Sequence, residues 1–275
     1  MRLVRNVAQS PKRDVGKIPW DPLVEGVSPH PSEVSGFYAV IHLAGESIAG
    51  RWTEKKKRAI RESRVRGTRN LAAALANSEP KPHVFLCASA IGFYGDGGEE
   101  VLTEDTPNGK GFLPEVCHEW EEASQTARQA GIRTVNLRTG LVLSAKGGAL
   151  SKMLIPFKLG LGGRIGSGKQ WWSWIHLDDM VGAVHHIVQT ESLSGPVNMV
   201  APNPVRNTDF TKVLASVLGR PAIFPVPGFA LAMVFGRMAA DELFLSSQRV
   251  EPRRLAASGY RFQFSDLRAT LASLV

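Results

Sequence analysis

Residues 38–46 read YAVIHLAGE, and this stretch decides the class of fold. Its first six residues are almost all apolar and favour strands, and the run ends in Ala44-Gly45. A short, unbroken apolar run that stops at a glycine is typical of a parallel strand covered on both faces of its sheet. We therefore predict a buried parallel strand at this point of the chain.

Strands and helices alternate after this stretch. Buried strands are predicted at residues 84–88, 133–143 and 197–200, with a short extended segment at 171–176. Helical patterns occupy residues 53–77, with Thr53 as N-cap, and residues 113–129 and 177–190. This order predicts an α/β fold: a Rossmann-like, doubly wound parallel sheet with helices on both faces.

The pattern changes after Pro204. Helical segments at residues 208–218, 228–240 and 266–274 are joined by loops that contain Pro and Gly. We predict that these segments form a small, mainly helical C-terminal lobe on the substrate side. The predicted domains are therefore residues 1–203 and residues 204–275.

The composition of the 275 residues is ordinary for a globular protein, with 43% hydrophobic and 21% charged residues. No apolar run approaches the roughly 18–20 residues that cross a bilayer, and residues 1–17 lack the apolar core of a secretory signal. Cys87 and Cys117 form neither a disulfide framework nor a metal-binding spacing. We predict a cytoplasmic protein without a membrane partner or a metal site.

Part of the formal net charge of +8 is concentrated in residues 51–58, RWTEKKKR. Such a run can bind nucleic acid. The alternative is the solvated face of a helix that also attracts an anionic ligand. We favour this alternative, and predict no nucleic-acid partner, because no nucleic-acid motif accompanies the charge and aromatic residues are not interleaved with it.

A glycine-rich loop lies in residues 162–176, GGRIGSGKQWWSWIH. The spacing from Gly163 to Gly168-Lys169 matches a Walker A loop, but Gln170 stands where Ser or Thr would hold the magnesium ion. The loop also lacks a preceding buried strand and a following helix, so a P-loop phosphotransferase rests on spacing alone. The glycines instead allow the loop to bend close to a ligand.

The sheet lacks the opening signature of a dinucleotide-binding fold. Such folds begin with a glycine-rich turn between their first strand and helix. Before Gly45 the chain has only three isolated glycines, Gly16, Gly26 and Gly36.

The remaining motifs nevertheless occur in the order found in one family. The chain resembles the atypical extended short-chain dehydrogenase/reductases. Within them it is most similar to the epimerase-family proteins, a branch also described as nucleoside-diphosphate-sugar epimerases or cell-division inhibitors. The motifs that carry this resemblance are LAGESIAGRW at 43–52, SRVRGT at 63–68, ASAIGFYG at 88–95, RTGLVL at 138–143, PFKLGLGGRIGSGKQWWSWIH at 156–176, PRRL at 252–255 and GY at 259–260.

The resemblance implies that the first strand–helix unit of the sheet is missing, because residues 1–5 match the end of the family's second strand. That strand lies at the centre of the order 3-2-1-4-5-6. We expect its loss to leave two half-sheets with unpaired edges, and a cofactor pyrophosphate without its helix N-terminus. A chain that starts from an internal methionine would explain the loss. The alternative is a divergent protein that no longer binds a dinucleotide.

The resemblance also implies NADP(H) as cofactor, with NAD possible. The cofactor-binding residues that it implies are Arg5, Leu43, Ala44, Glu46, Arg64 and Leu141. Arg5 and Arg64 would meet the 2′-phosphate, because a planar guanidinium suits phosphate oxygens. Without the resemblance, each residue has another interpretation. Arg5 and Arg64 would be solvent-exposed arginines, and Glu46 a charge at the start of a helix. Leu43, Ala44 and Leu141 would be core residues.

The Tyr-x-x-x-Lys motif that carries acid–base catalysis in the superfamily is absent. The three tyrosines are followed four residues on by His42, Gly98 and Phe264. Leu113 and Cys117 stand in the places of the Tyr and the Lys. Ser89 and Tyr94 are the candidate catalytic residues; the alternative for Tyr94 is a buried phenol bonded within the fold.

Gln170, Trp171 and Trp172 are the predicted substrate-binding residues. Together, these features predict an NADP(H)-binding oxidoreductase or epimerase-like protein that acts on an unidentified small molecule. The alternative is a cofactor-sensing or partner-binding protein that uses the same fold without turnover.

Overall fold

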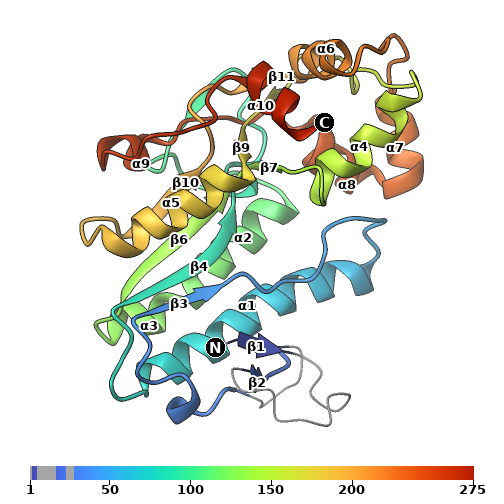
Figure 1. Ribbon diagram of the computed structural model, residues 1–275. Coiled ribbons are helices and arrows are strands. Elements are labelled where there is room, and N and C mark those ends of the chain that lie inside the picture. The colour runs from blue at the N-terminus through green and yellow to red at the C-terminus, as the bar shows by residue number, and fades with distance from the viewer. Residues whose placement is uncertain (1, 5–16, 23–27) are drawn as a thin grey trace. The chain divides into compact units, whose positions relative to one another are not determined.

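The computed structural model describes residues 2–4, 17–22 and 28–275, and Arg5 therefore lies outside the described residues. The chain divides into two compact units (Figure 1). Unit 1 comprises Met1–Ala49, Thr53–Ser89 and Val116–Asn136, and unit 2 comprises Gly50–Trp52, Ala90–Glu115 and Leu137–Val275. The domain boundary expected between residues 203 and 204 stays a prediction.

The predicted stretch forms β3 (Ala39–His42), which pairs in parallel with β4 (Val84–Ala90) so that His42 lies opposite Cys87. Helix α1 (Glu54–Ala76) connects the two strands. It begins as predicted, because the Thr53 side chain accepts a hydrogen bond from the Lys56 amide at 3.2 Å. A parallel pair with a helical crossover is the unit from which doubly wound sheets are built.

The four-stranded sheet has the order β10-β6-β4-β3, and β3 is an end strand. Strand β6 (Arg133–Thr139) runs from unit 1 into unit 2, and β10 is Gly195–Met199. Two further strands of unit 1, β1 (Arg2–Val4) and β2 (Lys17–Pro19), form a separate parallel sheet. Among the described residues, this sheet and the four-stranded sheet are separate.

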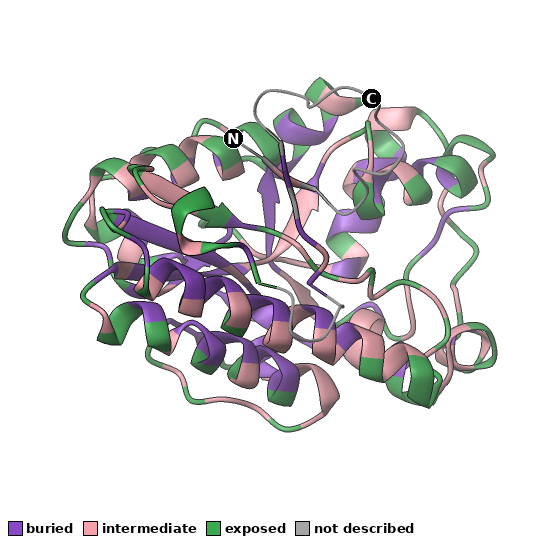
Figure 2. Cartoon of the chain, turned by 90° about the horizontal axis from the view of Figure 1, so that it is seen from below, coloured by how far each residue is buried: buried purple, intermediate pink, exposed green. Residues whose placement is uncertain are grey.

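Helices cover the sheet of unit 1 and bury its core. Besides α1 these are α2 (Phe112–Ala123), whose first residues belong to unit 2, α3 (Gln125–Gln129) and the short η1 (Pro31–Glu33). The core includes Leu71, Leu75, Phe85 and Trp120. Figure 2 shows buried residues along the strands and on the inner sides of the helices, with exposed residues on their outer sides. This pattern is the one predicted for an α/β sheet with covered faces.

Unit 2 contains short strand pairs and most of the C-terminal helices. Its elements are η2 (Ile91–Tyr94), β5 (Val101–Leu102), β7 (Leu141–Leu143), α4 (Gly148–Lys158), β8 (Trp171–Trp172), β9 (Trp174–His176), α5 (Leu177–Gln189), β11 (Val205–Arg206), α6 (Asn207–Leu218), α7 (Gly228–Phe235), α8 (Arg237–Ala240), the π-helix η3 (Asp241–Leu245), β12 (Arg249–Val250), α9 (Arg253–Ala257) and α10 (Leu267–Leu274). Strand β7 pairs with β9 and β12 with β5, both in parallel, whereas β11 pairs with β8 antiparallel. Trp174, Phe210 and Leu271 lie in its core.

Three predicted elements are interrupted in the structure. The strand expected at 133–143 divides into β6 and β7 at Gly140, where a Cβ atom would lie 2.6 Å from the Ser173 carbonyl oxygen. The helix expected at 113–129 divides at Ser124, whose hydroxyl bonds to Glu121 and Asn136. The helix expected at 228–240 divides at Gly236, because its φ of +86° is left-handed.

The glycine-rich loop does not have the structure of a phosphate-binding loop. It follows α4, a helix that the sequence pattern did not predict, and leads into β8. Its Gly166 and Gly168 amides donate to the carbonyls of Val226 and Ile165. Within the described residues no helix is long and apolar enough to cross a membrane.

Candidate cofactor and substrate sites

The candidate cofactor residues of unit 1 lie directly after β3. Leu43 and Ala44 line a cavity of about 640 Å³, and the Leu43 side chain is 63% exposed. Because β3 and β4 are parallel, both end at the same edge of the sheet. Ligands of open α/β sheets bind outside this carboxyl edge. The structure therefore brings Leu43 and Ala44 to the edge where a cofactor belongs in this class of fold.

Arg64 reaches this loop from α1. Its Nη1 donates to the carbonyl oxygens of Glu46 at 2.9 Å and Ile60 at 3.2 Å, and its guanidinium lies 5.0 Å from the centre of the Trp120 ring. Burial lowers the pKa of Arg64, while Cys117 and Glu46 oppose this shift. The guanidinium holds the loop in place through these contacts.

Gly45 and Glu46 complete this arrangement. A Cβ atom at Gly45 would lie 3.2 Å from the Arg64 Cζ, so a side chain at this position would press against the guanidinium. The Glu46 carboxylate forms an ion pair with Lys56 at 2.7 Å, and the Glu46 amide donates to the Ser63 hydroxyl. Glu46 and Arg64 thus lie together, and their contact with a cofactor stays a prediction.

Ser89, the first candidate catalytic residue, is buried near the end of β4. Its hydroxyl donates a 2.7 Å hydrogen bond to the carboxylate of Glu121, a buried residue of α2. Sequence reasoning missed Glu121, because no local pattern distinguishes it from the other acidic residues of that helix.

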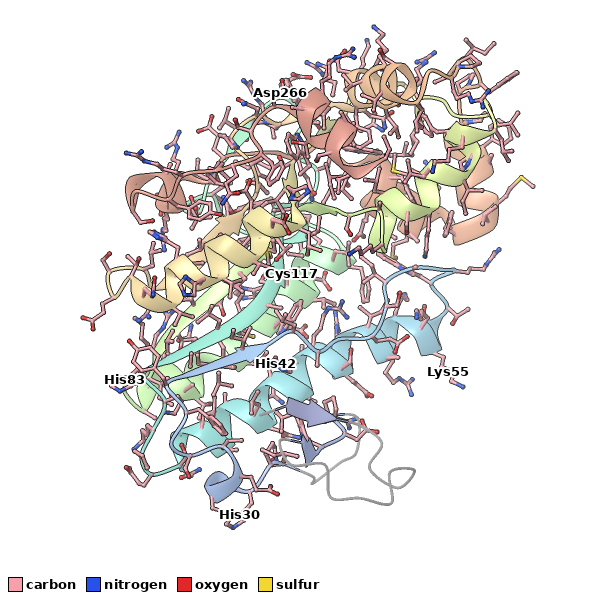
Figure 3. All side chains as sticks on the ribbon, in the orientation of Figure 1. His30, His42, Lys55, His83, Cys117 and Asp266 are labelled. Atoms are coloured by element: carbon pink, nitrogen blue, oxygen red, sulfur yellow. The ribbon has the colours of Figure 1, made fainter. Side chains whose placement is uncertain are left out.

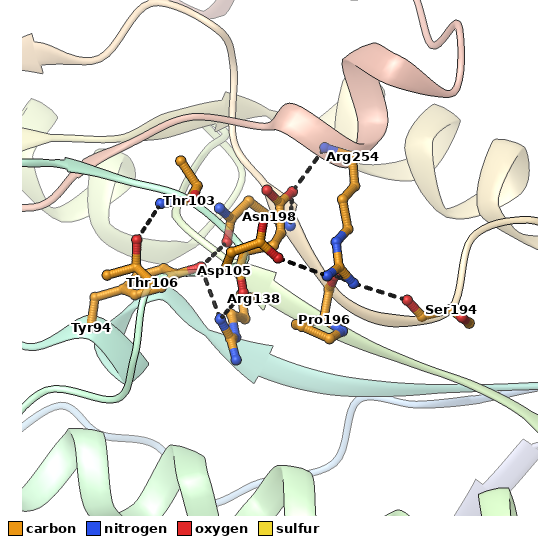
Figure 4. A network of polar contacts seen from close by, with 10 residues as sticks. Tyr94, Thr103, Asp105, Thr106, Arg138, Ser194, Pro196, Asn198 and Arg254 are labelled. Carbon is orange, nitrogen blue, oxygen red and sulfur yellow. Dashed lines mark hydrogen bonds and ion pairs between the residues drawn. The ribbon is translucent and has the colours of Figure 1, made fainter.

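Tyr94, the second candidate, lies in a buried polar network of unit 2 (Figure 4). Its hydroxyl donates to Asn198 Oδ1 at 2.6 Å and accepts from Arg138 Nη1 at 3.0 Å. Desolvation raises the pKa of Tyr94, and Arg138 counteracts the shift. Arg138 is itself buried against the Phe93 ring, 3.5 Å from its centre. The hydroxyl is therefore bonded within the fold.

A second cavity, of about 370 Å³, lies within unit 2 beside the start of α2. The Glu242 carboxylate, from the π-helix, accepts from the amides of Phe112 and Leu113 at 2.9 and 2.7 Å. An acidic group is favoured there by the exposed amides of a helix N-terminus. Residues from distant parts of the chain line the cavity: Gly92, Gly95, Asp96, Lys110, Leu113, Pro114, Arg237, Asp241, Glu242, Leu245, Ser246 and Gln248.

The three predicted substrate residues make contacts within unit 2. The buried Gln170 side chain donates to the carbonyls of Ile165 and Phe244, each at 3.1 Å. Trp171 lies beneath the guanidiniums of Arg206 and Arg249, and Trp172 packs edge-on against Phe210. Leu141, the remaining cofactor candidate, is half-buried in β7 and packs against the core of unit 2.

The histidine–aspartate segment after β9 joins parts of unit 2. His176 caps α5 by accepting from the Asp178 amide at 3.1 Å, and its ring stacks on Phe264 with centres 3.8 Å apart. The buried Asp179 carboxylate accepts from the amides of Gln263 and Phe264. Within the described residues, no three His, Cys, Asp or Glu side chains gather as a metal site would require.

A parallel Rossmann-like sheet, with candidate ligand residues at its carboxyl edge and a mainly helical C-terminal region, defines the class of fold. The chain belongs to the NAD dependent epimerase/dehydratase family, whose model matches residues 31–200. Residues 226–274 match a second model, described as a domain of unknown function, DUF1731. The resemblance predicted from the motifs is confirmed.

Relatives match over nearly the whole chain. Epimerase family protein YfhF of Bacillus subtilis is 39% identical, over 99% of this chain and 88% of its own length. Epimerase family protein SDR39U1 of Mus musculus is 36% identical, over 94% of this chain and 87% of its own. The predicted epimerase branch is therefore the correct one.

Solved structures agree with this placement. The crystal structure of human epimerase family protein SDR39U1 (isoform 2) with NADPH has a TM-score of 0.86 and 34% identity, over 94% of this chain and 86% of that one. A nucleoside-diphosphate sugar epimerase from Corynebacterium glutamicum has a TM-score of 0.77 and 37% identity, over 97% of this chain and 51% of that one. The dTDP-glucose 4,6-dehydratase DesIV from Streptomyces venezuelae shares the fold, with a TM-score of 0.73 at 17% identity.

Proposed function

We propose that the protein binds NADP(H) and transfers hydride to or from a small carbonyl or alcohol substrate in the cytoplasm. The observation that carries this proposal is the loop from Leu43 to Glu46, held by Arg64 at the carboxyl edge of a Rossmann-like sheet. The human relative with NADPH supports the choice of cofactor.

The described residues fit such a cofactor in part. The loop after β3 offers its backbone and the apolar side chains of Leu43 and Ala44, which we assign to the nicotinamide side. A cofactor contact of Leu141, in β7, stays a prediction. The pyrophosphate needs a helix N-terminus, and among the described residues no Gly-x-Gly-x-x-Gly turn joins a strand to a helix.

In our proposal the substrate binds in the cavity beside the start of α2. The lining of this cavity carries both signs of charge, with Lys110 and Arg237 among acidic groups. Arg237 pairs with Asp241 at 3.1 Å, whereas Lys110 makes no ion pair or hydrogen bond with the described residues. Gln170, Trp171 and Trp172 are assigned to the same substrate site. They would support it indirectly, through the contacts that they make within unit 2.

Proton transfer in this proposal is assigned to Ser89 or Tyr94. Ser89 is the better placed of the two, because Glu121 accepts its hydrogen and can orient the hydroxyl. Tyr94 would have to leave its bonds with Asn198 and Arg138 before it could donate a proton.

A second candidate is a protein that binds the cofactor without turnover. Leu113 and Cys117 at the places of the Tyr and the Lys favour it, as do the internally bonded hydroxyls of Ser89 and Tyr94.

The two functions are separated by binding and hydride-exchange measurements on the same sample. NADPH is titrated by fluorescence, and 4-deuterated NADPH is then incubated with a panel of aldehydes and ketones. Turnover predicts deuterium in the alcohol product, and Ser89→Ala lowers its rate about 100-fold or more if Ser89 moves the proton. Binding without any deuterium transfer supports the second candidate. The absence of NADPH binding contradicts both.

A further inference from the structure

Charged residues of both signs line the cavity of about 370 Å³ beside the start of α2, and most of them already have partners. Glu242 is held by two amides at the start of that helix, and Arg237 pairs with Asp241. Within the described residues, two charged groups of the lining are left over: one carboxylate oxygen of Asp96 and the ammonium of Lys110. These two groups are therefore the ones with which a ligand can pair.

The Asp96 carboxylate is held in one orientation by the backbone. Its Oδ1 accepts hydrogen bonds from the amides of Ser247 at 2.9 Å and Gly98 at 3.3 Å. Its Oδ2 accepts none from the part of the chain that the structure describes. Because Oδ1 is fixed, the position of Oδ2 is set before a ligand arrives, and an acceptor that is fixed in advance lowers the entropy cost of binding.

A second free acceptor lies close by, on the half-buried Gln248. The Nε2 of this side chain donates to the carbonyl oxygens of Ile91 at 3.2 Å and Gly95 at 3.1 Å. Both partners are acceptors, so the nitrogen must face them, and Oε1 is left without a partner among the described residues. Gly95 precedes Asp96 in the chain, and Ser247, which bonds to Asp96, precedes Gln248. The two free oxygens therefore offer an ammonium group a pair of neighbouring acceptors.

The segment that carries Lys110 packs against the same turn of the chain. Gly95 has a φ of +66°, and a Cβ atom there would lie 3.3 Å from the Lys110 carbonyl oxygen. The glycine thus allows the two segments to approach each other. The exposed Lys110 ammonium offers three donors, and neither Asp96 nor any other described residue accepts from it. It is a binding group for an anion.

The two groups together require both signs of charge in one ligand. A ligand with an anionic group alone would pair with Lys110 but would bring a like charge to Asp96, and a ligand with an ammonium alone would have the opposite defect. One unpaired cation also matches the single charge of a carboxylate better than the nearly double charge of a phosphate monoester. The volume of the cavity is roughly twelve times the ~30 Å³ that one water takes up in the liquid, so a molecule fills it better than a lone ion.

We propose that this cavity binds a zwitterion: an amino acid whose side chain carries the alcohol or carbonyl group. Its ammonium group donates to Asp96 Oδ2 and Gln248 Oε1, and its carboxylate accepts from Lys110. This assignment rests on the proposed function in one respect, because it takes the cavity as the substrate site. It names the class of substrate that the proposed function leaves open.

The test compares ligands that differ by one charged group. L-Serine carries both groups, 3-hydroxypropanoate lacks the ammonium, and 2-aminoethanol lacks the carboxylate. Dissociation constants are measured at pH 7 and low salt, without NADPH, from amide chemical shifts of the ¹⁵N-labelled full chain. We expect L-serine to bind at least about tenfold more tightly than either analogue; tenfold corresponds to about 1.4 kcal/mol.

Three outcomes would overturn the assignment. The first is that L-serine does not bind, and the second is that it binds no more tightly than an analogue with one charge. The third concerns the anionic group: 2-aminoethyl phosphate that binds more tightly than L-serine would replace the carboxylate by a phosphate. These comparisons use the unchanged chain, so they decide the question even where a variant fails to fold.

Variants assign each charge to its partner. Lys110→Gln is expected to weaken L-serine at least about tenfold and to leave 2-aminoethanol within about twofold, because a hydrogen bond to a charged group is lost only for the carboxylate. Asp96→Asn keeps Oδ1 as an acceptor and should weaken L-serine at least about tenfold, but not 3-hydroxypropanoate. The matched control is Lys55→Gln, at an exposed lysine at the start of α1 (Figure 3), which should bind L-serine unchanged. A loss of affinity for all three ligands in either cavity variant would contradict the assignment.

Hydride exchange separates a failure of this assignment from a failure of the proposed function. L-Serine that binds but exchanges no deuterium with the cofactor supports the ligand class and contradicts turnover. Deuterium transfer to uncharged aldehydes, in a chain that does not bind L-serine, supports the proposed function and overturns the ligand class.

Discussion

A single, partly buried arginine shapes the candidate cofactor loop. Arg64 contacts the carbonyl oxygens of Glu46 and Ile60, and it lies against Trp120 and beneath Gly45. A guanidinium that is partly withdrawn from water is stable only when its donors have partners. The family resemblance implied that Arg64 contacts the 2′-phosphate, and that role stays a prediction. Its support of the loop could not be foreseen because its partners are backbone atoms.

We expect Arg64→Met to destabilise the protein by about 1–3 kcal/mol, because two carbonyl oxygens lose a charged donor while the volume is kept. Urea unfolding measures the change. Arg58→Met, at an exposed position of the same helix, is the matched control and should stay within about 0.5 kcal/mol of the unchanged chain. Equal effects of the two substitutions would contradict a specific role of Arg64.

His42 should make stability fall in mild acid. Burial lowers its pKa from 6.5 to about 4. The unfolded chain therefore takes up a proton near pH 6.5 that the folded chain refuses until about pH 4, so the free energy of unfolding falls as the pH drops through this window. The loss is up to about 3 kcal/mol. The difference in unfolding free energy between the unchanged chain and His42→Leu, measured from pH 7.5 to 4, isolates this contribution; a difference independent of pH would contradict it.

At the scale of elements, Gly140 separates β6 from β7. A Cβ atom there would lie 2.6 Å from both the Ser173 oxygen and Val200 Cγ1, so Gly140→Ala must displace backbone. We expect a loss of about 2–4 kcal/mol in the free energy of unfolding. Gly147→Ala is the control, because a Cβ atom at Gly147 has nothing within 4 Å and its backbone is extended. If Gly140→Ala left the free energy of unfolding unchanged, the close approach of Ser173 and Val200 to Gly140 would not be what separates the two strands.

The existence of most elements could be predicted from sequence, but their interruptions could not. The run at 133–143 is continuous by composition, and the residues that force its break lie more than thirty positions away in sequence. The same applies to the site. Ser89 and Tyr94 could be named from their motif, whereas their partners Glu121 and Asn198 come from other elements and have no local signal.

At the scale of the whole molecule, the described residues form one four-stranded sheet, β10-β6-β4-β3, and a separate parallel sheet of β1 and β2. Sequence could not show that the two sheets enclose one apolar cavity with an unpaired His42 in it, because that depends on the placement of Leu3 and Ile18.

The division of the strands of unit 1 between two sheets predicts that the two units differ in stability. The sheet of unit 1 is divided and one of its strands is half-exposed, whereas unit 2 has an undivided core around Trp174, Phe210 and Leu271. Local opening requires less free energy where fewer apolar contacts must be broken. We therefore expect α1 and β4 to lose amide protection at lower urea concentrations than α6 and α10, measured by native-state hydrogen exchange. Unfolding would then not be two-state. Loss of protection in all four elements at one urea concentration would mean that the divided sheet does not weaken unit 1.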